Sequence, residues 1–155
     1  MLLDILLAIA ITSSVAAVSL HSYFRYYHQV EVNQLSDRID NVFESLNVFY
    51  NVNCNGGMNP IPTVANLVAL GNYSIDDSFN PFGGVLTPSI VWGVPTRLQV
   101  SATFSPEDLQ SMINTFNPSI VAGNTLTWSR IPSSFTNMRK GEQQIYRNMY
   151  MAECN

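Results

Sequence analysis

The sequence predicts an α+β protein in which a long N-terminal helix, about residues 1–50, packs on an antiparallel sheet with short helical insertions. Two observations predict this class. No Gly or Pro occurs between Met1 and Cys54, so nothing interrupts a helix over this stretch. Beyond it, short apolar segments alternate with turns rich in Asn, Gly and Pro. The 155 residues are enough for one globular domain and one additional element.

The composition narrows the classes of function. Charged residues make up 12% of the chain, against about a quarter in a typical soluble domain, and hydrophobic residues make up 46%. A surface this poor in charge favours association with a membrane or with copies of the same chain. The formal net charge of −4 and the single lysine, Lys140, disfavour a nucleic-acid partner, because non-specific binding needs clustered Lys and Arg.

The first half of the helix is apolar all round. From Ile5 to Phe24 no side chain is formally charged when His21 is counted as neutral. A helix of this length spans about 30 Å, which matches the hydrocarbon core of a bilayer. A signal peptide would begin with basic residues, whereas this start carries Asp4 and the first basic residue is Arg25, beyond the apolar run. We therefore expect a helix that stays with the protein.

The second half of the helix is predicted to be amphipathic, because its apolar residues recur at spacings of three and four. We expect residues 1–24 to form an apolar half-helix that crosses a membrane or packs in a bundle of identical helices. Residues 25–155 are expected to form a globular head that includes the amphipathic half. The apolar stripe that joins the helix to the head comprises Val32, Leu35, Ile39, Val42, Leu46 and Phe49.

Asp4 suggests how such helices would assemble. A lone carboxylate in an apolar region is unfavourable unless it is paired. If no leader precedes it, the terminal amine of Met1 is a cation, and an acid in the first turn also suits the helix dipole. In a staggered bundle, Asp4 of one subunit neutralises the Met1 amine of the next. Any other offset leaves a buried charge unpaired, so this pair would set the axial register.

The head is predicted to contain short helices and several strands. Residues 105–116 form a helix with Ser105 as N-cap and Pro106 in the first turn. The segment 97–104 alternates between apolar and polar side chains, which is typical of a strand with one buried face. The other expected elements are a loop at 51–62, a short helix at 63–71, a loop at 72–84, and strands at 85–92, 124–130 and 144–151.

The chain has two cysteines, Cys54 and Cys154. If they pair, the disulfide closes a loop of about 100 residues and stabilises the fold by roughly 4 to 5 kcal/mol on the chain-entropy model. A disulfide indicates an oxidising compartment, such as the periplasm or the cell exterior. We expect this disulfide, and two free buried thiols are the alternative.

The start MLLDILLAIAI, followed by a first helix of about fifty residues, resembles the type IV pilin superfamily. Members of this family carry an acid near the fifth residue of the mature chain, usually Glu, whereas this chain has Asp4. The resemblance implies a ladle-shaped subunit whose leader is removed by a prepilin peptidase and whose new terminal amine is methylated. It further implies a subunit that waits in the inner membrane until the pilus assembly machinery incorporates it into an extracellular filament.

A turn in the head resembles type IVb pilins, including those of conjugative thin pili. In these proteins an Asn-Pro-aromatic-Gly-Gly turn leads into two strands and a helix, and here the turn spans Asn80 to Gly84. Relatives often pair a cysteine of that helix with one near the C-terminus. Residues 108–112 contain no cysteine, so a Cys54–Cys154 disulfide would instead tie the tail to the end of the first helix.

The sequence gives little sign of catalysis. His21 and His28 are the only histidines. One interpretation is a metal site formed with Glu31. We favour the other, in which both histidines are polar members of the aromatic cluster YFRYYH at a membrane surface. The head has no His, so no Ser-His-Asp set is available. Asp76 and Asp77 indicate a solvated turn, with calcium binding as the alternative. We expect no enzyme activity, no cofactor, no metal and no catalytic residue.

Charges are distributed unevenly along the chain. Up to Asp108 there are nine acidic and three basic residues, whereas beyond it there are two acidic and four basic residues. Scatter over a solvated surface is one interpretation. The other is docking between heads in a filament, in which the basic residues of one subunit face an acidic surface of its neighbour. The basic residues are Arg130, Arg139, Lys140 and Arg147, and the acidic surface is Asp37, Asp40 and Glu44.

The sequence therefore predicts the structural subunit of a bacterial type IV pilus, a homo-oligomer that polymerises through its apolar half-helix. Adhesion, aggregation, motility or DNA transfer would be the role of such a filament. Thr12 to Ser19 are expected to loosen on assembly, because their hydroxyls compete for backbone groups. Two alternatives remain. One is a minor pilin or type II secretion pseudopilin that primes or tips a filament, and the other is a membrane-anchored periplasmic binding module.

Overall fold

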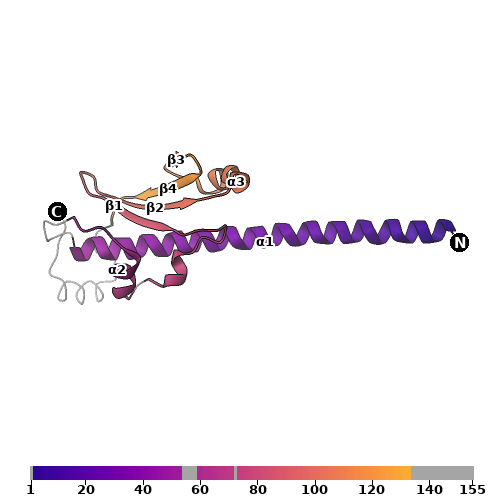
Figure 1. The fold of residues 1–155 in the computed structure, drawn as a ribbon, viewed down its shortest axis with the longest axis horizontal. Coiled ribbons are helices and arrows are strands. Elements are labelled where there is room, and N and C mark those ends of the chain that lie inside the picture. The colour runs from indigo at the N-terminus through magenta and orange to yellow at the C-terminus, as the bar shows by residue number, and fades with distance from the viewer. Residues whose placement is uncertain (1, 54–58, 72, 134–155) are drawn as a thin grey trace.

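The computed structural model describes residues 2–53, 59–71 and 73–133, and it leaves the side chains of residues 2–4 and 8 undescribed. Within these ranges the chain is α+β, as predicted, with a long N-terminal helix and a four-stranded antiparallel sheet. Figure 1 shows the helix α1 running the length of the molecule. The sheet and the shorter helices gather around its C-terminal half, and the N-terminal half projects alone.

Helix α1 spans Leu2–Asn53, 52 residues without interruption. It is about 78 Å long at 1.5 Å per residue. It ends a few residues beyond the predicted boundary, at the start of a segment rich in Asn and Gly. Burial begins at Val30, and the six stripe residues, Val32, Leu35, Ile39, Val42, Leu46 and Phe49, are between 0% and 8% exposed.

The sheet has the strand order β1-β2-β4-β3, and every neighbouring pair is antiparallel. β2 (Arg97–Thr103) and β4 (Thr125–Arg130) form its centre, and β1 (Thr87–Val91) and β3 (Ile120–Ala122) form its edges. The predicted strands at 85–92, 97–104 and 124–130 therefore exist, the first of them over a shorter span. β3 was not predicted, and the predicted strand at 144–151 lies outside the described residues.

The two faces of the sheet differ, which explains why a single helix suffices to cover it. The inner face packs against α1 through buried residues of the central strands: Leu98, Val100 and Ala102 of β2, with Leu126 and Trp128 of β4. The outer face carries a polar ladder between the same strands. Its three pairs are Gln99 with Ser129 at 3.1 Å, Ser101 with Thr127 at 2.8 Å, and Thr103 with Thr125 at 3.1 Å.

Two short helical elements lie on the side of α1 opposite the sheet (Figure 1). α2 spans Val64–Ala69 and is capped by Thr63, whose hydroxyl accepts from the Asn66 amide at 3.2 Å. η2, a 3₁₀-helix over Ile75–Ser78, falls inside the predicted loop 72–84. A capping box between Ser74 and Asp77 stabilises it, so this part of the loop prediction was wrong.

α3 spans Pro106–Phe116 and begins as predicted, with the Ser105 hydroxyl accepting from the Asp108 amide at 3.2 Å. Asn117 ends it in the left-handed conformation, with φ of 43°. Met112 is fully buried and Leu109, Ile113 and Phe116 are half-buried, so the predicted stripe faces the core. Figure 1 places α3 at the end of the head nearest the projecting half of α1.

Candidate functional site

The most prominent candidate site is the apolar half of α1. Between residues 5 and 29, every described side chain is exposed. Its large hydrophobic side chains expose between 54% and 70% of their surface: Ile5, Leu6, Leu7, Ile9, Ile11, Val15, Val18, Leu20, Tyr23, Phe24, Tyr26 and Tyr27. A patch of this extent is unfavourable in water and indicates contact with lipid or protein.

This helix has the length and composition to cross a membrane. Its most apolar 18-residue window has a mean hydropathy of 1.9, and none of that window is buried within the chain. Signal sequences meet the same criterion, and so do core helices of soluble proteins. A core helix, however, would be mostly buried, so full exposure argues against that explanation here.

Hydroxyl side chains inside the apolar half bond to the turn that precedes each of them. The Ser13 and Ser14 hydroxyls donate to the carbonyls of Ile9 and Ala10 at 2.8 Å, and Ser19 donates to Val15 at 2.9 Å. Each therefore satisfies its hydrogen-bonding group without a partner from another element. α1 is continuous across Thr12 to Ser19 in the single chain, and the expected loosening on assembly stays a prediction.

An aromatic collar, which we define as Tyr23, Phe24, Tyr26 and Tyr27, ends the apolar half. The ring of Tyr23 lies 6.2 Å from that of Phe24 and 6.1 Å from that of Tyr27. All four rings are exposed. Tyr and Trp are enriched where a membrane meets water, so the collar fits the predicted position at an interface.

The two histidines occupy different environments. His21 is exposed on the apolar half, whereas the His28 ring meets the Phe82 ring edge-on at 5.5 Å. Phe82 belongs to the predicted Asn-Pro-Phe-Gly-Gly turn, in which Gly83 and Gly84 take positive φ values of 100° and 82°. Within the described residues, no group of three His, Cys, Asp or Glu side chains is placed to hold a metal ion.

The buried side-chain amide of Asn80 fixes the conformation of this turn. Its side-chain oxygen accepts from the Phe82 amide at 3.0 Å, and its side-chain nitrogen donates to the Thr103 carbonyl at 3.4 Å. The ring of Phe82 also lies 6.1 Å from that of Phe104 on the sheet. The turn therefore joins the sheet to α1 at His28, just where the projecting half begins.

The expected acidic surface on α1 is only partly available for a neighbour. Asp40 binds Arg130 of the same chain, with 2.5 Å between the carboxylate oxygen and the guanidinium nitrogen. In the single chain Arg130 therefore has an acidic partner of its own, and docking between heads stays a prediction. Asp37 and Glu44 are exposed and make no hydrogen bond or ion pair with any described residue. Arg139, Lys140 and Arg147 lie outside the described ranges.

Several predicted site residues lie outside what the structure describes. Met1, Cys54 and Cys154 are among them, and so is the side chain of Asp4, although its backbone belongs to the first turn of α1. The Met1–Asp4 pair and the Cys54–Cys154 disulfide therefore stay predictions.

A small pocket between α1 and β4 was not foreseen from the sequence. Its lining comes from three stretches far apart in the chain, residues 36–43, 116–119 and 128–130, so no local motif signals it.

Comparison with known proteins found no relative of this chain. No family model, no curated protein and no solved structure matches it.

Proposed function

We propose that this chain is the structural subunit of a bacterial type IV pilus, most like the type IVb class. The observation that carries the proposal is the division of α1 into two halves of opposite character. One half is buried against the sheet along its apolar stripe, and the other is apolar and exposed over about 25 residues wherever its side chains are described. A helix that fits both lipid and a bundle of identical helices is what such a subunit requires.

The proposed subunit waits in the inner membrane with its apolar half in lipid. On assembly the same surface packs against sister helices in the core of an extracellular filament, so the transfer never exposes it to water. Asp4 would pair with the terminal amine of the neighbouring subunit and fix the axial offset. The head, with the Cys54–Cys154 disulfide, would form the outer surface of a ladle-shaped subunit.

Replacing Asp4 by Ala tests this assembly role in cells that display the protein. We expect filaments in the sheared fraction to fall at least about tenfold, because a tenfold change corresponds to only about 1.4 kcal/mol of lost pairing. Glu107→Ala is the control, since Glu107 is an exposed acid on α3 and lies outside the acidic surface expected to face a neighbouring subunit. Normal filament yield from Asp4→Ala would contradict the proposal.

Site-specific photo-cross-linking tests the partner of the apolar half. A photoreactive residue at Val18, which is 67% exposed, should yield a ladder of subunit multimers from filaments. The same residue at Asn114, an exposed position on α3, is the control for contact between heads. Capture at position 18 of lipid alone would favour a monomeric membrane-anchored module. Ladders together with very low abundance would favour a minor pilin or pseudopilin.

A further inference from the structure

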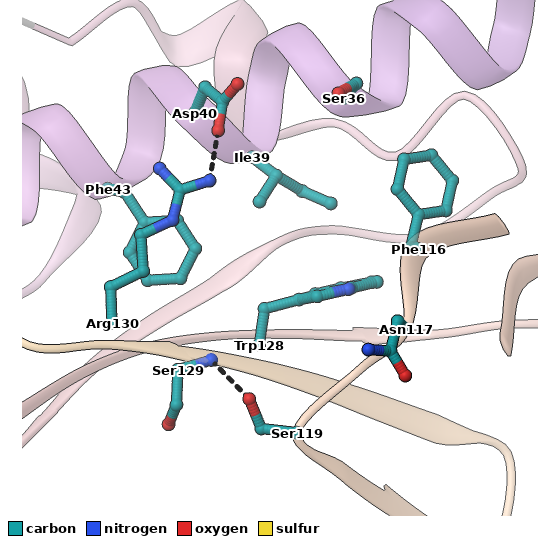
Figure 2. Close-up of a pocket in the computed structure, with 10 residues that line it drawn as sticks. All are labelled: Ser36, Ile39, Asp40, Phe43, Phe116, Asn117, Ser119, Trp128, Ser129 and Arg130. Atoms are coloured by element: carbon teal, nitrogen blue, oxygen red, sulfur yellow. Dashed lines mark hydrogen bonds and ion pairs between the residues drawn. The ribbon is translucent and has the colours of Figure 1, made fainter.

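A pocket opens between α1, the C-terminal end of α3 and β4 (Figure 2). Figure 2 shows the Trp128 ring across its floor, Phe116 on one side, Arg130 on the other, and α1 above with Ser36 and Ile39. The cavity volume is about 180 Å³. Sites for drug-sized ligands usually measure about 300–1,000 Å³, so this one admits a single ring-sized group.

The lining combines aromatic surface with neutral polar groups. Phe43, Phe116 and Trp128 supply the aromatic carbon. Ser36 supplies a hydroxyl and Asn117 an amide, and neither side chain makes a hydrogen bond to another described residue. The pocket therefore offers both donors and acceptors around an apolar floor.

The charged groups at the rim cancel each other. Asp40 and Arg130 are paired with each other, and the guanidinium also lies 4.3 Å from the centre of the Phe43 ring. A cationic ligand would have to displace Arg130 from Asp40, and an anionic ligand would have to displace Asp40 from Arg130. The pocket therefore favours a ligand without charge.

The Trp128 ring on the floor also carries a donor. The indole nitrogen of Trp128 is buried and has no hydrogen-bond partner among the described residues, while the whole side chain is only 8% exposed. Figure 2 shows this nitrogen at the end of the ring nearer Phe116 and Asn117. This donor is buried away from the pocket, so the unpaired polar groups of the described lining that are open to a ligand are those of Ser36 and Asn117.

We propose that this pocket binds a neutral, hydroxyl-rich ring, namely one sugar unit of a glycan. The apolar face of the sugar lies on Trp128 beside Phe116, and its hydroxyls bond to Ser36 and Asn117. An apolar ligand would leave those polar groups unpaired. This inference does not depend on filament assembly, because every residue in it belongs to the head of a single chain.

The test uses the full chain in phosphocholine micelles, which carry no sugar. Trp92→Phe leaves Trp128 as the only tryptophan, so its fluorescence reports on the pocket. The probes are the methyl glycosides of mannose, galactose and N-acetylglucosamine, with acetate and lysine methyl ester as charged counterparts. We expect at least one glycoside to bind with a Kd on the order of 1 mM.

Pocket variants decide the location of binding. Ser36→Ala and Asn117→Gly each remove one polar group, and Gly suits the positive φ at position 117. At least one of them should weaken binding about fivefold or more, which is the loss of one hydrogen bond. Ser111→Ala, on an exposed part of α3, should leave the Kd unchanged. The inference is overturned if no glycoside binds below about 50 mM, if neither pocket variant changes the Kd, or if a charged probe binds more tightly.

Discussion

At the scale of single residues, the pair of Asp40 and Arg130 joins α1 to β4 at the edge of the head. Both side chains are about half exposed, at 52% and 53%, so the pair contributes at most about 1 kcal/mol. The contact of the guanidinium with the Phe43 ring adds about 0.5–1 kcal/mol. This pair therefore positions Arg130 more than it stabilises the fold.

A double-mutant cycle should show this modest coupling. We expect Asp40→Asn and Arg130→Met each to lower the free energy of unfolding by about 1 kcal/mol, with a coupling of about 0.5–1 kcal/mol. Urea unfolding of the four proteins in one detergent measures it. Asp37→Asn is the control, because Asp37 is exposed and pairs with no described residue. A coupling above about 3 kcal/mol would mean that the pair is shielded from water by a contact that the single chain lacks.

Tyr73 gives the head a specific dependence on alkaline pH. Burial of its hydroxyl, and to a lesser extent the nearby Asp77 carboxylate, raises the pKa of Tyr73 from 10.0 to about 12. The folded chain therefore binds more protons than the unfolded chain between these values, and stability falls as the pH rises through this window. The fall should reach at most about 2–3 kcal/mol.

Tyr73→Phe should remove this part of the alkaline loss. It should also leave the head as stable at pH 8 as before, or more stable, because the hydroxyl is buried without a partner among the described residues. Denaturant unfolding between about pH 8 and pH 11.5 measures the difference. Tyr23→Phe, which changes an exposed ring, should keep the original pH profile. Identical profiles for all three proteins would show that Tyr73 titrates normally.

At the scale of elements, the N-cap of α3 is a sharp test of local structure. The Ser105 hydroxyl accepts from the Asp108 amide at 3.2 Å and donates to its carboxylate at 2.7 Å. We expect Ser105→Ala to lower the free energy of unfolding by about 1 kcal/mol. Ser111→Ala, in the same helix but without a capping role, should change it by less than about 0.5 kcal/mol. Equal effects of the two substitutions in thermal unfolding would contradict the capping argument.

The elements also show what could be predicted from sequence and why. Helix α1 and the central strands follow from strong periodicities: no helix breaker over the first 53 residues, and strict alternation in β2. β3 has three residues, all exposed, so it has no alternating pattern to detect. Signals did exist for both missed elements. Gly123 and Asn124 form a typical hairpin turn, and Ser74 followed by Asp77 is a capping box.

At the scale of the whole molecule, the two halves of α1 differ in how far sequence reasoning can reach. The apolar half can be recognised from composition alone, because lipid or sister helices can cover it from any side. The pocket cannot be recognised from the sequence, because its walls come from α1, α3 and β4 and meet only through tertiary packing. A surface made by one element can be predicted from sequence, whereas a site shared by three elements needs the fold.

The division of α1 into a buried half and an exposed half predicts that the head folds without the projecting half. Residues 5–27 are exposed wherever their side chains are described, and the ring of His28 contacts that of Phe82 in the head. A chain that begins at His28 therefore keeps every buried residue of the described core. We expect its free energy of unfolding to lie within about 0.5 kcal/mol of that of the full chain in the same detergent, and we expect it to remain monomeric in water without detergent.

Chemical denaturation and gel filtration measure both expectations. A chain that begins at Leu46 is the matched control, since it loses the stripe residues Val32, Leu35, Ile39 and Val42 and should not fold. A loss of more than about 2 kcal/mol for the chain that begins at His28 would mean that the apolar half supports the head. The head and the apolar half would then be one cooperative unit. In that case, lipid or sister helices bound to the apolar half would change the stability of the head. If the two halves fold independently, binding at the apolar half leaves the stability of the head unchanged.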